Sequence, residues 1–361
     1  SNSNLTGLNV VNVAAPGSEI TINGGTITCN DQNANENYAA LAMNKDAVGA
    51  KIAATGVTFD IKGDSKKASN GAVGGVITID GKTDEVAVNV AYISYGDNYY
   101  SFTSIEAAIE AIRDFDGTGI GILEISHRTP GWERVMAEVE QLWRDLLNIP
   151  DDYAVFFVGG GASTQFFQVP ANLLKTKAAY LQTGVWAKKA AKEAKFYGDV
   201  EIVASSEDKT YSYIPKNYTI PTDVDYFHIT TNNTIYGTEI HEDIDCPVTL
   251  VADMSSDIMS RPVDIKKYGM IYGGAQKNVG PAGVTFVIIR KDLLGSSERK
   301  LQSMVDYATH YPEEARNHSM YNTPPVFPIF VMYQTLKWVK EIGGVEVMYK
   351  MNKEKAELLY N

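Results

Sequence analysis

The sequence YGGAQKNVGPAG, residues 272–283, places Lys277 in a glycine-rich turn between two apolar runs. We predict a short strand over residues 270–272 that leads into this turn and a second strand over 284–289 that follows it. A lysine in such a turn can approach a carbonyl compound without crowding, and its desolvated amine can form a Schiff base. Taken alone, a lysine beside glycines is more often a surface residue, so the interpretation depends on the rest of the chain.

An acid ends a second apolar run, CPVTLVAD at residues 246–253. A cofactor such as pyridoxal phosphate needs a carboxylate at its ring nitrogen, because the protonated ring is what withdraws electrons. Asp253 suits this role, since it ends a predicted strand upstream of Lys277. An isolated aspartate in such a position would more often be the cap of a helix.

Two other segments have features of a cofactor site. In FFVGGGASTQF, residues 156–166, a strand ends at three glycines and a helix begins, which predicts a cradle of backbone N–H groups for a phosphate. This is not a Walker A loop, because the Gly-Lys-Ser/Thr end is missing, and Thr164 breaks the dinucleotide spacing. Trp186, in TGVWAKKA at 183–190, could stack on a planar ring, although core packing is the commoner role of a tryptophan.

Taken in order, these segments resemble one family, the phosphoserine aminotransferases. The resemblance runs from about residue 113 to 361 and rests on a series of short motifs in a fixed order. They are SHR (126–128), GGAS (160–163), TGVW (183–186), NNTI (232–235), ADMSS (252–256), GAQKN (274–278) and YNTPP (321–325).

The resemblance implies pyridoxal 5′-phosphate as the cofactor. Lys277 would hold it as a Schiff base and move the proton between substrate and cofactor, Asp253 would pair with the pyridine nitrogen, and Trp186 would stack on the ring. The remaining implied cofactor contacts are Ala162, Ser163, Thr234, Gln276, Asn322 and Thr323. Of these, Asn322 and Thr323 would reach the phosphate of the neighbouring subunit's cofactor, which implies a homodimer with shared active sites.

The implied reaction is a two-stage amino transfer between glutamate and 3-phosphohydroxypyruvate, which gives phosphoserine and 2-oxoglutarate. His127 and Arg128 would bind the anionic groups of these substrates, because a guanidinium fork suits a carboxylate or a phosphate. We therefore expect a cytoplasmic enzyme of serine biosynthesis with small-molecule substrates.

The resemblance also implies differences at both ends. The family opens with a segment containing an Ala-Gly-Pro turn, for which this sequence has no counterpart. It also continues into a smaller C-terminal domain that supplies an arginine for the substrate carboxylate, whereas this sequence stops at Asn361, within a predicted long helix. We therefore expect a cofactor-binding core that lacks part of its substrate clamp.

Residues 1–112 have a different composition from residues 113–361. The first hundred residues contain no Arg, Trp or His and a single proline, Pro16. Short alternating stretches between Asn/Gly/Asp turns predict strands, and a short helix follows at Ser104. The stretches GGTIT (24–28), GVTF (56–59) and GVIT (75–78) form a loose repeat. The repeat favours stacked β-coils, as in a β-solenoid, and a fragment of an ordinary β-sandwich is the alternative. Residues 92–109 faintly resemble bacterial surface repeat proteins.

The composition narrows the classes of partner. A net charge of −12 argues against nucleic acid or an anionic membrane as a partner. The two cysteines, Cys29 and Cys246, do not form a disulfide framework, and the five histidines show no metal-ligand spacing. We expect no bound metal.

Residues 113–361 alternate between helical and strand patterns, which predicts an α/β domain. A helical stripe from Trp132 to Leu147 is typical of a core-facing helix, and another helix is expected over 187–195. Strands are expected over 154–158, 179–181, 200–204, 226–229, 249–252, 270–272 and 284–289. With the resemblance, this pattern predicts the large domain of a fold-type I pyridoxal phosphate enzyme, a mostly parallel sheet wrapped by helices.

Two other functions compete with this interpretation. A cysteine desulfurase would need a mobile cysteine after the lysine, and no cysteine follows Cys246. The other alternative is a non-enzymatic surface or interaction module, in which the β-rich segment is fused to a truncated, inactive aminotransferase core.

Overall fold

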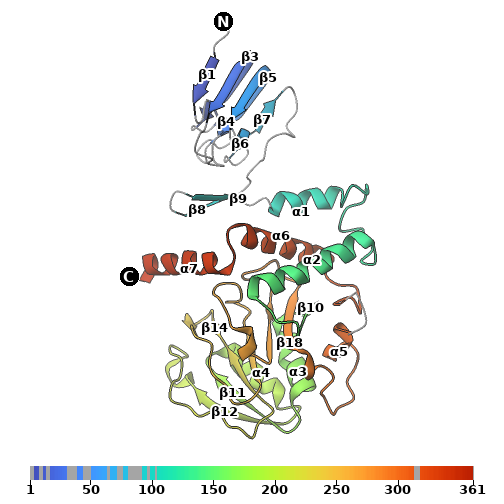
Figure 1. Cartoon of the computed structure of the whole chain (residues 1–361). Coiled ribbons are helices and arrows are strands. Elements are labelled where there is room, and N and C mark those ends of the chain that lie inside the picture. Colours follow the sequence, from blue (N-terminus) through green and yellow to red (C-terminus); the bar gives the residue numbers. More distant parts are fainter. Residues whose placement is uncertain are drawn as a thin grey trace. The chain divides into compact units, whose positions relative to one another are not determined.

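The structure is a computed structural model that describes residues 4–7, 11–13, 17–30, 39–43, 50–62, 66–70, 76–79, 92–95, 98–101, 104–312 and 318–360. The chain divides into an N-terminal unit, Ser1–Ala107, and a C-terminal unit, Ala108–Asn361. Figure 1 labels some of the elements of each unit. The helix α1 (Ser104–Arg113) spans the division and ends near the predicted boundary at residue 112.

The N-terminal unit contains two parallel sheets. One has the order β1-β3-β5-β7 and the other β2-β4-β6. Their strands are β1 (Asn4–Gly7), β2 (Val11–Val13), β3 (Glu19–Asn30), β4 (Ala39–Met43), β5 (Lys51–Lys62), β6 (Lys66–Asn70) and β7 (Val76–Ile79), and β8 (Tyr92–Tyr95) and β9 (Asn98–Ser101) form an antiparallel hairpin. Stacked β-coils also pair their strands in parallel, and the β-solenoid interpretation of this unit stays a prediction.

The register of these ladders places like side chains in columns. Ile20 pairs with Ile52, and Ile52 with Ile77, so that isoleucines from three strands lie side by side. The first two predicted repeats also pair, since Thr26 is opposite Thr58. The third repeat does not continue this column, because Val76 pairs with Lys51, at the other end of β5. The columns supply the small core of this unit.

The C-terminal unit is built on a sheet of seven strands in the order β10-β18-β17-β16-β13-β11-β12. β18 is antiparallel to both of its neighbours, and the other pairs are parallel. The strands are β10 (Tyr153–Val158), β11 (Lys177–Gln182), β12 (Asp199–Ser205), β13 (Tyr226–Thr230), β16 (Leu250–Asp253), β17 (Met270–Gly274) and β18 (Thr285–Arg290), and β14 (Asn232–Asn233) and β15 (Thr238–Glu239) form a small hairpin. The predicted mostly parallel α/β sheet is confirmed, and all seven predicted strands are present.

Helices cover both faces of this sheet, so its central strands are buried on both sides, whereas the edge strand β12 is largely exposed or half-buried. On β10, Val155 and Phe157 join the core on the side of α2, while Phe156 points to the opposite core with α3 and α4. The helices are α2 (Pro130–Leu147), α3 (Ala162–Leu173), α4 (Val185–Ala194), α5 (Tyr307–His310), α6 (Val326–Glu341) and α7 (Val345–Tyr360), with 3-10 turns at Glu207–Lys209, Ile265–Lys267 and Lys291–Leu293.

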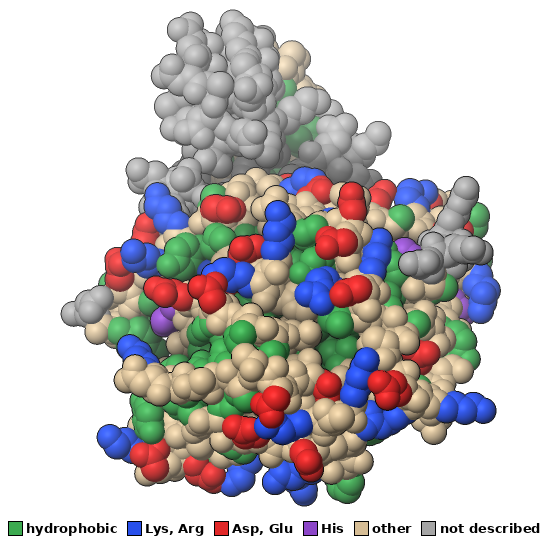
Figure 2. Space-filling view, turned by 60° about the horizontal axis from the view of Figure 1, so that its bottom comes forward, with side chains coloured by type: hydrophobic (Ala, Val, Ile, Leu, Met, Phe, Trp, Pro, Cys, Tyr) green, Lys and Arg blue, Asp and Glu red, His purple; other side chains and the backbone are tan. Residues whose placement is uncertain are grey.

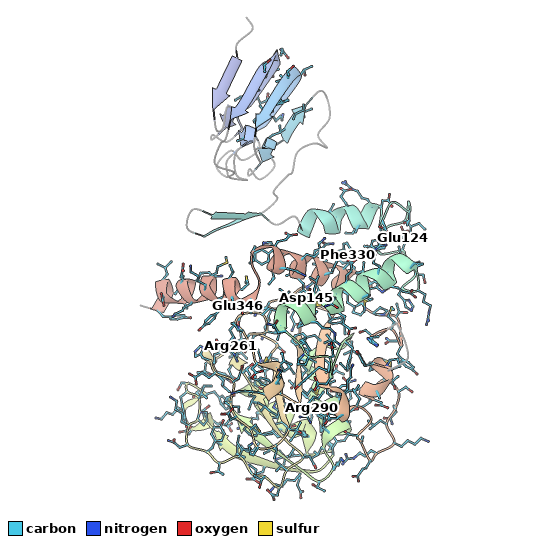
Figure 3. The ribbon with its side chains drawn as sticks, viewed as in Figure 1. Glu124, Asp145, Arg261, Arg290, Phe330 and Glu346 are labelled. Carbon is cyan, nitrogen blue, oxygen red and sulfur yellow. The ribbon has the colours of Figure 1, made fainter. Side chains whose placement is uncertain are left out.

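The predicted helical stripe lies on α2. Thr129 caps the helix by accepting a hydrogen bond from the Trp132 amide, and Pro130 occupies the first turn, where its missing N–H has no cost. Every residue of the stripe is buried except Leu146, which is half-buried. α2 packs against α6, and Asp145 and Phe330, both labelled in Figure 3, lie on these two helices. Asp145 also forms an ion pair with Lys340 of α6, at 2.7 Å.

The surface of the C-terminal unit carries charged side chains of both signs, interspersed over the face drawn in Figure 2. Within the described ranges, no helix is both long and apolar enough to cross a membrane. The same residues contain no group of three or more His, Cys, Asp or Glu side chains arranged to hold a metal ion.

Candidate active site

A cavity of about 160 Å³ lies at the carboxyl ends of the parallel strands in the C-terminal unit, where open α/β sheets bind their ligands. Its walls come from the last residues of strands and from the segments that follow them. The lining residues are Gly161, Ala162, Ser163, Phe166, Trp186, Thr230, Asn232, Asp253, Ser255, Ser256, Gln276 and Lys277. Six of the predicted site residues therefore line one cavity: Ala162, Ser163, Trp186, Asp253, Gln276 and Lys277.

Lys277 follows β17, as predicted, and its side chain is exposed. Its Nζ donates a hydrogen bond to Thr234 Oγ1 at 2.9 Å, which brings a seventh predicted residue to the site. Gly273 is required just before this turn, because a Cβ there would lie 2.5 Å from the Phe286 ring and 2.8 Å from Ser255 Cα. The glycine lets β17 approach the segment after β16, so the lysine and the acid share one cavity.

Asp253 ends β16 and is 4% exposed. Its Oδ1 accepts hydrogen bonds from the Ser255 amide at 3.0 Å and from the Ser255 hydroxyl at 2.6 Å. Burial raises the pKa of this carboxyl, while the Ser255 hydrogen bonds and the charge of Lys277 oppose the shift. Within the described ranges no Lys, Arg or His forms an ion pair with Asp253. A cationic ligand group at its other oxygen would therefore stabilise it.

The glycine run forms the predicted turn between β10 and α3. Gly160 and Gly161 have φ values of 98° and 71°, which favour glycine, and a Cβ on Gly160 would lie 2.1 Å from Thr164 Oγ1. Gly161 is the N-cap of α3, and no side chain caps this helix end. The N-terminus of α3 at Ala162 and Ser163 therefore lines the cavity with backbone suited to an anion.

Trp186 stands in the first turn of α4, directly after β11. It is half-buried, and Lys189 Nζ lies 4.6 Å from its ring centroid. Gly184 allows the turn before the helix to approach Asn233, because a Cβ there would lie 2.6 Å from Asn233 Oδ1. The cavity thus has an aromatic wall, as the sequence predicts.

Some lining residues were not singled out from the sequence. Ser255 could have been recognised, because a serine two residues after an aspartate is well placed to hydrogen-bond its carboxylate. Thr230, Asn232 and Phe166 gave no such signal. Thr230 is in register with Asp253 on the neighbouring strand, and its buried hydroxyl has no partner within the described residues.

Besides Thr234, four predicted site residues do not line this cavity. Arg128 is exposed, and His127 is half-buried with an unpartnered Nε2, in the loop before α2. Asn322 and Thr323 are exposed, and the Asn322 amide donates to the Thr323 carbonyl at 3.4 Å. The roles of these residues toward substrates and a neighbouring subunit stay predictions.

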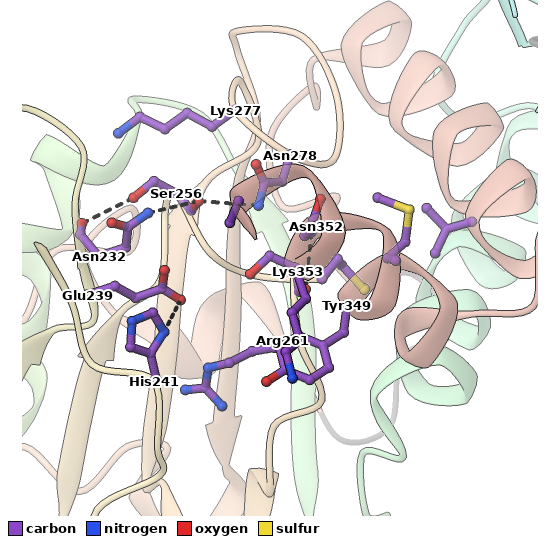
Figure 4. Close-up of a pocket in the computed structure, with 15 residues that line it drawn as sticks. Asn232, Glu239, His241, Ser256, Arg261, Lys277, Asn278, Tyr349, Asn352 and Lys353 are labelled. Atoms are coloured by element: carbon purple, nitrogen blue, oxygen red, sulfur yellow. Dashed lines mark hydrogen bonds and ion pairs between the residues drawn. The ribbon is translucent and has the colours of Figure 1, made fainter. Parts of the chain in front are cut away.

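A second cavity of about 590 Å³ adjoins the first and is drawn in Figure 4. Asn232, Ser256 and Lys277 line both cavities. The far wall of the larger cavity is formed by α7, whose Asn352 donates a hydrogen bond to the Ser260 carbonyl at 3.2 Å. The space beside Lys277 is therefore larger than the first cavity alone.

Comparisons with known proteins place this chain in a family. The class-V aminotransferase family matches residues 101–361. The phosphoserine aminotransferase of Phocaeicola vulgatus is 57% identical over 256 residues, which cover 71% of each chain. The structure of the phosphoserine aminotransferase from Bacillus circulans subsp. alkalophilus is 43% identical with a TM-score of 0.68, and that of the pyridoxal phosphate-bound enzyme from Trichomonas vaginalis is 35% identical with a TM-score of 0.67. Each covers 71% of this chain and 72% of its own. The chain therefore belongs to the class-V aminotransferases and, within them, to the phosphoserine aminotransferases.

Proposed function

We propose that this chain is a phosphoserine aminotransferase, which transfers an amino group between glutamate and 3-phosphohydroxypyruvate to give phosphoserine and 2-oxoglutarate. The observation that carries the proposal is the meeting of Lys277, Asp253 and Trp186 at one cavity, in a chain that is 57% identical to such an enzyme. The alternative, an inactive core fused to an interaction module, has no comparable support.

The residues of the cavity fit pyridoxal phosphate. The unpaired, buried carboxylate of Asp253 suits a protonated ring nitrogen, and the uncapped start of α3 suits a phosphate. When bound, the cofactor supplies a carbonyl carbon for amine exchange and a ring that withdraws electrons from the substrate. Trp186 would cover one face of the ring and hold its plane.

Lys277 would hold the cofactor and act as the base that moves the substrate proton. A mobile amine next to the reacting carbon can do both, because it is released once the substrate amine has replaced it. The Thr234 hydroxyl accepts a hydrogen bond from Nζ and so helps to hold the lysine in place. Gln276, next to Lys277, would contact the cofactor.

We further propose that His127 and Arg128 bind substrate anions, and that Asn322 and Thr323 contact the cofactor phosphate of a second subunit. Neither pair lines the cavity within one chain. This agrees with the proposed roles, because one pair would contact bound substrate and the other the cofactor of a second subunit. A homodimer and a cytoplasmic location are parts of this proposal.

The test is a two-step assay with purified chain and pyridoxal phosphate. Glutamate alone should give one equivalent of 2-oxoglutarate, and later addition of 3-phosphohydroxypyruvate should give phosphoserine. The Lys277→Ala variant is the matched control and should give neither product. Wild-type chain that binds the cofactor but forms no 2-oxoglutarate would refute the proposal and favour the inactive-core alternative.

A further inference from the structure

Asp257 is a buried carboxyl that does not line the cofactor cavity. It follows β16 in the same turn as Ser255, and it is 2% exposed. Its Oδ1 lies 2.6 Å from Thr231 Oγ1, and its Oδ2 has no hydrogen-bond partner in the described part of the chain. Burying a carboxylate without full hydrogen bonding costs free energy of folding, which is characteristic of residues kept for function rather than for stability.

The Thr231 hydroxyl lies between two oxygen atoms. It is 2.6 Å from Asp257 Oδ1 and 3.1 Å from the Asp253 carbonyl oxygen. A hydroxyl has a single proton, so it can donate to only one of these oxygens at a time. If Asp257 is neutral, it donates to Thr231, and Thr231 donates to Asp253. If Asp257 is ionised, it accepts a hydrogen bond from the Thr231 hydroxyl, which then no longer donates to the Asp253 carbonyl.

The surroundings of Asp257 favour its neutral form. Burial is the main cause that raises its pKa, to about 7; the hydrogen bond with Thr231 lowers the pKa, and the charges of Glu239 and Asp253 raise it. Arg261, labelled in Figures 3 and 4, acts in the opposite direction. However, its guanidinium pairs with Asp243 at 2.9 Å rather than with Asp257.

The turn that contains Asp253 and Asp257 is joined to the end of β13 by further hydrogen bonds. The Thr231 amide donates to the Asp253 carbonyl at 3.1 Å, and the Ser256 hydroxyl donates to the Asn232 carbonyl at 3.1 Å. The Asn232 side chain donates in return to the Ser256 carbonyl at 3.4 Å, as the dashed lines of Figure 4 show. The Asp257–Thr231 contact is therefore the buried side-chain link in a joint between two strand ends that line the cavity.

We propose that Asp257 is a positioning residue, which holds Asp253 at the cofactor ring nitrogen through the hydroxyl of Thr231. The inference rests on the proposed function, because it assumes that Asp253 pairs with the ring. Asp257 touches neither cofactor nor substrate in this scheme. Asp257 fixes the backbone of Asp253 through Thr231, while Ser255 fixes the side-chain carboxylate of Asp253.

The test compares pyridoxal phosphate dissociation constants, measured by titration of visible absorbance, for four variants and the wild type. Asp257→Asn keeps a neutral donor toward Thr231 and should bind within about twofold of wild type. Asp257→Ala and Thr231→Val each remove the link and should weaken binding by about tenfold, which corresponds to the loss of one hydrogen bond. The double variant Asp257→Ala/Thr231→Val should bind no worse than either single variant, because both remove the same link.

Thermal unfolding of each variant without cofactor identifies any variant that fails to fold. If Asp257→Ala does not fold, the nearly isosteric variant Thr231→Val still tests the link. Equal affinities for wild type and Thr231→Val would overturn the inference and leave the proposed function standing. Asp257→Asn that binds as weakly as Thr231→Val would also overturn it. Wild-type chain that does not bind pyridoxal phosphate would overturn the proposed function and this inference together.

Discussion

The two units of the chain both use parallel strands, but they use them in different ways. In the N-terminal unit, paired strands place like residues side by side, as in the column Ile20, Ile52 and Ile77. In the C-terminal unit, each parallel strand ends in a different residue, and Asp253 and Lys277 meet at one edge. Similar apolar residues on neighbouring strands form a core, whereas different polar residues at the ends of neighbouring strands form a binding site.

The largest expected effect is at the C-terminal site. Lys277→Ala should remove covalent cofactor binding and lower phosphoserine formation by about 10³-fold or more, because the variant has no amine to hold the cofactor or move the proton. The visible absorbance of the cofactor-loaded chain and the product assay check this. A variant that keeps the absorbance of a lysine-bound cofactor would show that another residue holds it.

Asp253→Ala should weaken cofactor binding and slow the glutamate half-reaction by about 10²-fold or more, because the ring nitrogen loses the carboxylate that keeps it protonated. Single-turnover kinetics with glutamate measure the effect. Asp253→Asn is the matched control for shape, and it should be nearly as slow. A full half-reaction rate in either variant would refute the role of Asp253.

A change in the N-terminal column should leave the site intact. Ile52 is 1% exposed, so Ile52→Ala should destabilise that unit by about 3 kcal/mol through lost burial and a cavity. Calorimetry should show an earlier transition for one unit only, with an unchanged pyridoxal phosphate dissociation constant. A parallel loss of cofactor affinity would mean that the two units are not independent.

The pKa of Asp257 predicts a stability difference that depends on pH. Because the folded-state pKa is raised from 3.8 to about 7, the stability that this group contributes is fully present below about pH 4 and is lost as pH rises through 7. Asp257→Asn removes that loss and should be more stable than wild type by up to about 4 kcal/mol at pH 8, since each pKa unit corresponds to about 1.4 kcal/mol, with little gain at pH 4. Denaturant unfolding at both pH values measures this. If Asp257→Asn changed the free energy of unfolding equally at the two pH values, the raised pKa of Asp257 would be contradicted.

The smallest expected effect is on substrate binding. Arg128→Lys should raise the KM for 3-phosphohydroxypyruvate by about tenfold, because an ammonium lacks the planar fork of a guanidinium. The dissociation constant of pyridoxal phosphate should not change. An equal loss of substrate and cofactor binding would make Arg128 a structural residue.

Much of the C-terminal site could be predicted because its residues follow recognisable strands. Asp253 ends an apolar run, Lys277 follows one in a glycine-rich turn, and the glycines before Ala162 mark a strand-to-helix turn. Thr230, Asn232 and Asp257 could not be predicted in the same way. Their positions depend on β13 lying beside β16 in the sheet, and periodicity along the chain does not specify strand order.

The N-terminal unit illustrates the same limit. Two of the three predicted repeats lie side by side, but residues 76–79 pair with the start of β5 instead of with its second repeat. The register of parallel strands depends on the connections between them, and these connections differ in length along the chain. A repeat in the sequence therefore predicts strands more reliably than it predicts their pairing.

The most direct test of the C-terminal site is to reduce the pyridoxal phosphate-loaded chain with borohydride, which fixes a cofactor bound to a lysine, and then to map the modified peptide by mass spectrometry. We predict a single modified lysine, Lys277, whose labelling falls when glutamate is added before reduction. Modification of Lys353 on the neighbouring cavity wall, or of several surface lysines to a similar extent, would contradict the assignment of this strand-end cavity as the active site.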